Sequence, residues 1–109
     1  MRRKFRADED ALEMQVRLCK AFAHPTRLRI LDLVSDGECA LGEVQAALGN
    51  SGSNLSQHLA VLKSVGVVST RREGKVVYCA LALPEVKEAC QRIRQVLRAQ
   101  LSKRPRLDV

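Results

Sequence analysis

Hydrophobic side chains recur along most of this 109-residue chain at the three- and four-residue spacing of amphipathic helices. The pattern predicts helices over residues 8–23, 25–36, 41–48, 51–66 and 84–101. Between the last two helices, two short segments rich in β-formers flank Glu73-Gly74, which is typical of a β-hairpin. The chain is therefore predicted to be mainly α-helical, with a hairpin of strands over 67–72 and 75–81.

The helix predicted between Ser51 and Gly66 has an apolar stripe on one side and a polar N-terminal tip on the other. The stripe consists of Leu55, Leu59, Leu62 and Val65. A shorter helix precedes it, Gly49 is placed to end that helix, and Ser51 is the expected N-cap of the next one. Two such helices in succession are typical of a helix-turn-helix, whose second helix enters the major groove of DNA. The expected base contacts are Ser51, Ser53, Asn54, Ser56, Gln57 and His58. The alternative is an ordinary helical hairpin with a solvated tip.

The predicted hairpin carries cations beside its turn. A basic hairpin directly after a recognition helix is typical of the wing of a winged helix, which reaches the phosphates or the minor groove. The expected phosphate contacts are Lys63, Arg71, Arg72 and Lys75. The alternative is a solvated hairpin with routine surface charge.

Four segments of the chain resemble the ArsR/SmtB family of bacterial repressors, and they occur in the family's order. They are His-Pro-Thr-Arg-Leu-Arg-Ile-Leu over 24–31, Ser-Gln-His-Leu-Ala-Val-Leu-Lys over 56–63, Gly-Val-Val over 66–68 and Arg-Arg-Glu-Gly-Lys over 71–75. The similarity extends from about Leu18 to Leu101. It implies a winged-helix homodimer that leaves its operator when an inducer binds, commonly a metal or metalloid ion.

The first and last predicted helices each present an apolar seam, and a small domain of this kind gains stability by burying such seams in a dimer. The first seam consists of Leu12, Val16, Cys19 and Ala23, and the last of Val86, Cys90, Ile93, Leu97 and Leu101. Asp8, Glu9 and Asp10 are expected near the positive end of the first helix. His24 precedes Pro25 and is expected to cap the second helix, of which Leu28, Leu31 and Val34 would face inward.

The net charge of +7 is concentrated at the two ends of the chain. Residues 1–6 carry four cations, and residues 102–109 carry three cations and one anion. We therefore expect a flexible basic arm over 1–7, one winged-helix domain over 8–101 and a basic tail over 102–109, with the ends adding salt-sensitive affinity for DNA. No apolar run is long enough to span a membrane, and no signal peptide is apparent, so a cytoplasmic location is expected.

The four cysteines contain no Cys-x-x-Cys pair, so any joint thiol site must be assembled by the fold. Three of them are interpreted as small core residues, Cys19, Cys79 and Cys90, with Cys79 the weakest sensing candidate. Cys39 is expected at a helix start, where the helix dipole favours the thiolate. Thiolates select soft ions such as As(III), Zn(II), Cd(II) or Cu(I). The family's two motif cysteines, however, correspond here to Ala40 and Gly42, and residues 82–101 lack the His and Asp of its other metal site.

Three function classes follow from these observations. A dimeric DNA-binding repressor accounts for the helix-turn-helix, the wing and the apolar seams together. Its inducer would be a thiophilic ion such as arsenite or, alternatively, an oxidant or persulfide acting on a thiol. A helical protein-interaction module would account for the seams but not for the basic hairpin. An enzyme is not expected, because no nucleophile, phosphate loop or acid–base pair accompanies the two histidines.

Overall fold

A computed structural model describes residues 2–49 and 52–103, with side chains described over 8–49 and 52–103. The elements in chain order are α1 (Arg2–Phe22), α2 (Pro25–Leu33), β1 (Cys39–Ala40), α3 (Leu41–Leu48), α4 (Gly52–Ser64), β2 (Val68–Glu73), β3 (Val76–Leu81) and α5 (Glu85–Lys103). The predicted fold class, mainly helical with a β-hairpin, is confirmed. The N-cap predicted at Ser51 and residues 104–109 of the predicted tail lie outside the described residues.

The core of the domain is aliphatic and lies between α2, α3, α4 and the sheet. Its most deeply buried side chains are Ile30, Val34, Val44, Leu62, Val67 and Cys79. The predicted stripe of α4 is confirmed, since Leu55, Leu59 and Leu62 are all buried. Of the residues of the second helix predicted to face inward, Leu31 and Val34 are buried and confirm the prediction, whereas Leu28 is exposed and Ile30 is buried instead. This helix ends at Leu33, three residues before the predicted end.

The sheet has three antiparallel strands in the order β1-β3-β2. The hairpin of β2 and β3 was predicted, whereas β1 was not, because two residues are too few to show a strand period. In β3, Cys79 lies opposite Thr70 of β2 on one side and opposite Cys39 of β1 on the other. The strand before α3 is thus joined directly to the wing.

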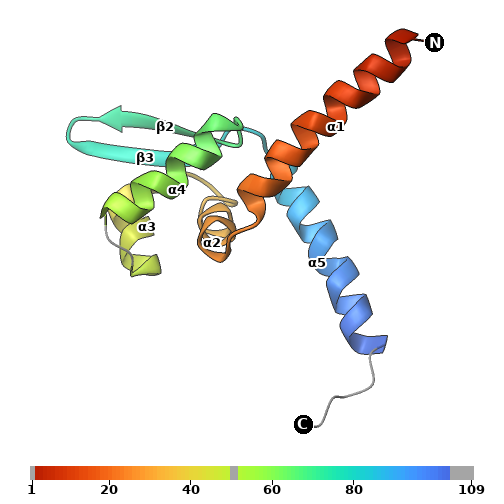
Figure 1. The fold of residues 1–109 in the computed structure, drawn as a ribbon. Helices are drawn as coiled ribbons and strands as arrows, with labels where there is room; N and C mark the ends of the chain where they lie inside the picture. The colour runs from red at the N-terminus through yellow and green to blue at the C-terminus, as the bar shows by residue number, and fades with distance from the viewer. Residues whose placement is uncertain (1, 50–51, 104–109) are drawn as a thin grey trace.

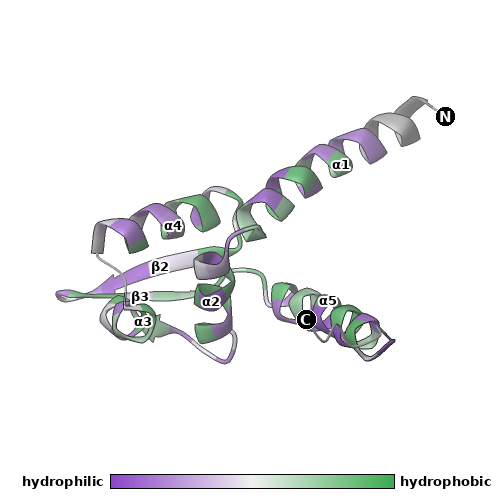
Figure 2. Ribbon diagram, turned by 60° about the horizontal axis from the view of Figure 1, so that its bottom comes forward, coloured by the Kyte–Doolittle hydropathy of each residue, from purple (hydrophilic) through white to green (hydrophobic). Residues whose placement is uncertain are grey.

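Helices α1 and α5 extend from the side of α2 that faces away from the wing (Figure 1). Figure 2 shows apolar stripes along both projecting helices. The predicted start of α1 at Asp8 was wrong, and residues 2–7 of the expected flexible arm are helical. Those residues contain no Gly or Pro that would stop a helix, so Asp8, Glu9 and Asp10 lie inside α1 rather than at its positive end. Within the described ranges, no helix has both the length and the apolar character needed to cross a bilayer.

Candidate nucleic-acid interface

Helices α3 and α4 form a helix-turn-helix whose second helix exposes its polar tip. Gly49 ends α3 in the left-handed conformation, with φ 69°, and its N–H donates to the Gln45 carbonyl at 2.8 Å. Helix α4 begins three residues later and docks through its leucine stripe. The other side of its first two turns is exposed and consists of Ser53, Asn54, Ser56 and Gln57. These short hydroxyl and amide side chains can exchange hydrogen bonds with base edges.

His58 differs from the other predicted base contacts because its ring is partly buried against α2. The ring centroid lies 4.4 Å from that of His24, and its Nδ1 lies 3.4 Å from Arg27 Nη1. Burial, and then the neighbouring His24 and Arg27, lower the pKa of His58 and favour its neutral form. His58 therefore joins α4 to α2, and its base contact stays a prediction.

The N-terminal turn of α2 contacts both α1 and α4. His24 is its N-cap, as predicted, since His24 Nδ1 accepts from the Thr26 N–H at 3.1 Å. Arg27, one turn further on, donates through Nε to the Ala21 carbonyl at 2.6 Å and through Nη2 to the Lys20 carbonyl at 3.4 Å. Arg27 thereby holds the last turn of α1 while it also contacts His58 of α4. The sequence gives no signal for this role, because it depends on how α1 folds back on α2.

The wing presents two exposed cations beside α4. Arg72 lies near the end of β2 and Lys75 lies in the turn, and neither has an ion-pair partner among the described residues. Alternation along β2 puts Arg72 on the same face as Thr70, whose Oγ1 accepts from Lys63 Nζ of α4 at 3.1 Å. Lys63 and Arg72 therefore lie toward one surface of the helix and the wing, as phosphate contacts would require.

Arg71, by contrast, has partners within the protein, although its side chain is half exposed. Its guanidinium donates to both carboxylate oxygens of Glu38 and, at 2.9 Å, to Glu73. It also lies over the Tyr78 ring, 4.4 Å from the centroid. The hydrogen bond from Arg71 lowers the pKa of the Glu38 carboxyl. The Arg71 guanidinium thus braces the wing against the residue before β1, a contact between positions 33 apart in the chain, and its phosphate contact stays a prediction.

Comparison with known proteins places this arrangement in a family. A family model described as a helix-turn-helix domain matches residues 22–71. Rv0081 of Mycobacterium tuberculosis, described as an uncharacterised HTH-type transcriptional regulator, is 37% identical over 97 residues, spanning 88% of this chain and 85% of Rv0081. The crystal structure of Rv0081 matches with a TM-score of 0.78 over 84% of this chain and 93% of that one.

Two further relatives are also transcriptional regulators or DNA-binding domains by their descriptions. The transcriptional activator HlyU of Vibrio cholerae is 46% identical over 70 residues, which span 64% of this chain and 65% of HlyU. The solution structure of Mb0332 of Mycobacterium bovis is described as a homodimeric winged helix-turn-helix DNA-binding domain and a possible ArsR-family regulator. It matches with a TM-score of 0.80 and 32% identity, over 91% of this chain and 92% of that one. The chain belongs to the ArsR/SmtB family of transcriptional regulators.

The cysteines of this ArsR/SmtB regulator agree with the sequence interpretation in part: Cys79 is a core residue and Cys90 packs partly buried against the core, whereas Cys19 is exposed. Cys39 lies in β1, two residues before α3 begins, so the prediction that it starts the helix was wrong. Its thiol donates to the Leu33 carbonyl at 3.2 Å. Cys79 is fully buried opposite Cys39, whereas Cys19 is exposed on α1. Burial raises the pKa of Cys79 to about 11.

These positions do not fit a soft-ion site within one protomer. Among the described side chains, no group of three or more His, Cys, Asp or Glu residues is arranged to hold a metal ion. The two thiols that the fold brings together come from neighbouring strands, and the other two lie on α1 and α5. We therefore derive no step through As(III), Zn(II) or Cd(II).

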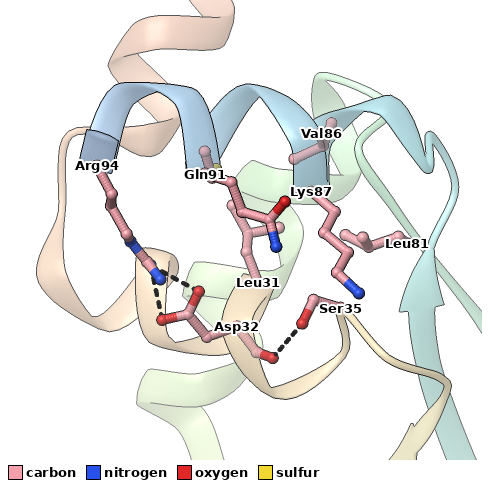
Figure 3. A pocket seen from close by; sticks show the side chains of 9 residues that line it. Leu31, Asp32, Ser35, Leu81, Val86, Lys87, Gln91 and Arg94 are labelled. Atoms are coloured by element: carbon pink, nitrogen blue, oxygen red, sulfur yellow. Dashed lines mark hydrogen bonds and ion pairs between the residues drawn. The ribbon is translucent and has the colours of Figure 1, made fainter. Parts of the chain in front are cut away.

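The first half of α5 is fixed to α2 around a small cavity of about 70 Å³ (Figure 3). Arg94 donates to both carboxylate oxygens of Asp32, at 2.6 and 2.7 Å, and Lys87 pairs with Asp36 at 2.6 Å. Cys90 lines the same cavity, and burial raises the pKa of its thiol. These contacts set the direction in which the exposed half of α5 leaves the domain.

Proposed function

We propose that this ArsR/SmtB regulator is a homodimeric repressor that reads an operator with α4, grips the flanking phosphates with its wing and leaves the operator when its thiols are modified. The observation that carries the proposal is the exposed polar tip of α4 beside an exposed basic wing. A helical interaction module would need neither feature. A dimer bound at an operator that overlaps the promoter blocks transcription by occupying the DNA. Repression of this kind needs no activity of the protein beyond DNA binding.

The two kinds of DNA contact come from different residues. Ser53, Asn54, Ser56 and Gln57 offer neutral donors and acceptors suited to base edges in the major groove. The cations Lys63, Arg72 and Lys75 are suited to phosphates, where they add affinity without reading sequence. His58 and Arg71 serve in this proposal as positioning residues that hold α4 and the wing at their observed places.

The dimer is proposed to form through α1 and α5. Leu12 and Val16 of α1 are 59% and 51% exposed, and Ile93 and Leu97 of α5 are 56% and 54% exposed. Long helices that expose such apolar residues to water are typical of a surface that a second copy of the chain covers in a dimer. The described homodimer of Mb0332 supports this assignment. In a twofold dimer the two α4 helices would meet successive major grooves about 34–36 Å apart.

Thiol modification is favoured as the inducing event by the pairing of Cys39 with Cys79 beside the wing. Release from DNA requires that the modified form prefer a different geometry from the DNA-bound one. Strand β1 is well placed for such coupling, because it leads directly into the helix-turn-helix and is bonded to the wing strand β3.

The proposal is tested by selecting duplexes from a random pool with the purified protein and measuring affinity for the selected and for unrelated duplexes. Gln57→Ala is expected to weaken binding to the selected duplex by about 1–3 kcal/mol and to change binding to unrelated DNA little. Lys75→Ala is the matched control and should weaken both. If no duplex is enriched, or if Gln57→Ala weakens both duplexes equally, the assignment of α4 as the reading helix is wrong.

A reporter gene placed behind the selected operator then tests the sign of regulation. Expression should rise when the regulator is deleted, as it does for a repressor. A fall in expression would identify an activator, as HlyU is described to be.

A further inference from the structure

The strand register places two of the four cysteines directly opposite each other. Cys39 of β1 and Cys79 of β3 are Cα partners in neighbouring antiparallel strands. Directly opposed residues of such strands project from the same face of the sheet, with Cα atoms about 4.5–5.5 Å apart. Disulfides form at Cα separations of about 4.4–6.8 Å. The backbone at this position therefore already has the spacing that a disulfide needs.

The two thiols differ in their access to solvent. Cys79 lies in the core, between Thr70 and Cys39, and is fully buried. Cys39 is half-buried, and its Sγ donates to the carbonyls of Leu33 at 3.2 Å and Gly37 at 3.8 Å. A small oxidant from solvent therefore reaches Cys39 first, and the buried partner acts second.

We propose that Cys39 and Cys79 form a dithiol pair that a hydroperoxide converts into a disulfide, and that this disulfide weakens operator binding. In the first step, Cys39 takes one oxygen from hydrogen peroxide to become a sulfenic acid, and one water is released. In the second step, the Cys79 sulfur attacks the Cys39 sulfur, the sulfenic oxygen leaves as a second water, and the S–S bond forms. Two thiols are oxidised and one peroxide is reduced.

The high pKa of Cys79, about 11, makes the second step slow at neutral pH and faster in alkali. The Cys39 sulfenic acid should consequently persist long enough to be trapped by dimedone. Trapping should be strongest in Cys79→Ala, in which no second thiol can consume the sulfenic acid.

The effect on DNA rests on the function proposed above. The disulfide removes the Cys39 hydrogen, so the carbonyls of Leu33 and Gly37 lose their donor, and the Cys39 sulfur must turn from the end of α2 toward β3. Helix α3 begins two residues later, so the lost hydrogen bonds loosen the start of the helix-turn-helix from the end of α2. Because α3 and α4 both pack against α2, the change alters how α4 and the wing meet the duplex together.

The chain suits a direct test, because trypsin separates the four cysteines onto different peptides. Cys19 falls on residues 18–20, Cys39 on 30–63, Cys79 on 76–87 and Cys90 on 88–92. After peroxide treatment, a non-reducing digest of the full-length protein should contain peptide 30–63 linked to 76–87, and dithiothreitol should release it. The link should also form in Cys19→Ser/Cys90→Ser and should be absent from Cys39→Ser. A link between any other two peptides, or sulfinic acid at Cys39 without a link, would overturn the pair.

The DNA measurement uses Cys19→Ser/Cys90→Ser, so that only the proposed pair can react. Its oxidised form should bind the selected operator at least about fivefold more weakly than its reduced form, with full recovery after reduction. Equal affinity of the linked and reduced forms would overturn the regulatory part of the proposal. If the reduced protein binds no duplex, the proposed function fails, whereas the peptide link is judged separately.

Discussion

Replacing Arg72 with Gln removes a wing cation that has no carboxylate partner among the described residues. Replacing Glu38 and Arg71 together with Gln removes an ion pair and leaves the net charge unchanged. If Arg72 neutralises a phosphate and Arg71 only braces the wing, these two variants will differ in the salt dependence of operator binding. The comparison tests the division of the wing arginines that the Glu38–Arg71 contact implies.

The expected size of the difference follows from counterion release. Each phosphate contact contributes about 0.9 to the slope of log affinity against log salt, and a twofold dimer loses two contacts when Arg72 is replaced. The slope should therefore become shallower by about 1.8. Between about 50 and 200 mM salt, the affinity deficit of Arg72→Gln relative to the wild type should shrink roughly twelvefold. The double variant should bind more weakly by a factor that salt leaves unchanged.

Fluorescence anisotropy of a labelled operator, titrated at four or more salt concentrations, measures both slopes. Circular dichroism and sedimentation of each variant verify that the fold and the dimer persist. The reasoning is refuted if the double variant flattens the slope as much as Arg72→Gln does, because Arg71 would then be a phosphate contact that leaves Glu38 on binding DNA.

Three further predictions concern the core, the dimer and the His58 contact. Leu62→Ala should lower the free energy of unfolding by about 2–5 kcal/mol in urea titrations, whereas the neighbouring, partly exposed Val61→Ala should cost clearly less; equal losses would contradict the packing. Leu97→Asp should leave the fold intact by circular dichroism and weaken dimerisation at least tenfold, about 1.4 kcal/mol, in sedimentation; an unchanged dimer would remove α5 from the interface. The pKa of His58 in the folded protein lies below 6.5, so the unfolded chain binds more protons at this residue, and the free energy of unfolding should fall as pH decreases from about 7. The His58→Gln variant should show a weaker pH dependence of stability. Identical pH profiles of the variant and the wild type would count against the contact.

The helix-turn-helix and the wing could be predicted from sequence because their signals are local. The leucines of α4 recur within one helix, Gly49 marks a single left-handed residue, and Glu73-Gly74 lies between two runs of β-formers. His24 was predicted as a cap for the same reason, since its hydrogen bond reaches only two residues along the chain. Periodicity and turn chemistry are properties of neighbouring residues, so one sequence suffices to read them.

What could not be predicted depends on residues that are distant in the chain. Arg71 resembles its neighbour Arg72 in the sequence, and only the approach of Glu38 gives the two side chains different surroundings. Cys39 and Cys79 are 40 positions apart, and the two-residue strand that aligns them carries no pattern of its own. The apolar seam of α1 was identified from its spacing, but a different face, with Leu18, Ala21 and Phe22, packs on the domain core. A period locates an apolar face without saying which surface covers it.

The contacts of α2 explain how the projecting helices and the DNA-facing elements can influence one another. Among the side chains described, those of 8–49 and 52–103, the hydrogen bonds and ion pairs that join α1 or α5 to another element end on α2 or on the turn after it. The same helix contacts α4, through Arg27 and His58, and β1, through the hydrogen bond from the Cys39 thiol to the Leu33 carbonyl. A change in the angle between α1 and α5 must therefore strain these α2 contacts or move α4 and β1 with them. This gives the proposed dimer interface and the proposed thiol pair a shared mechanical element, through which each can alter the spacing of the two reading helices.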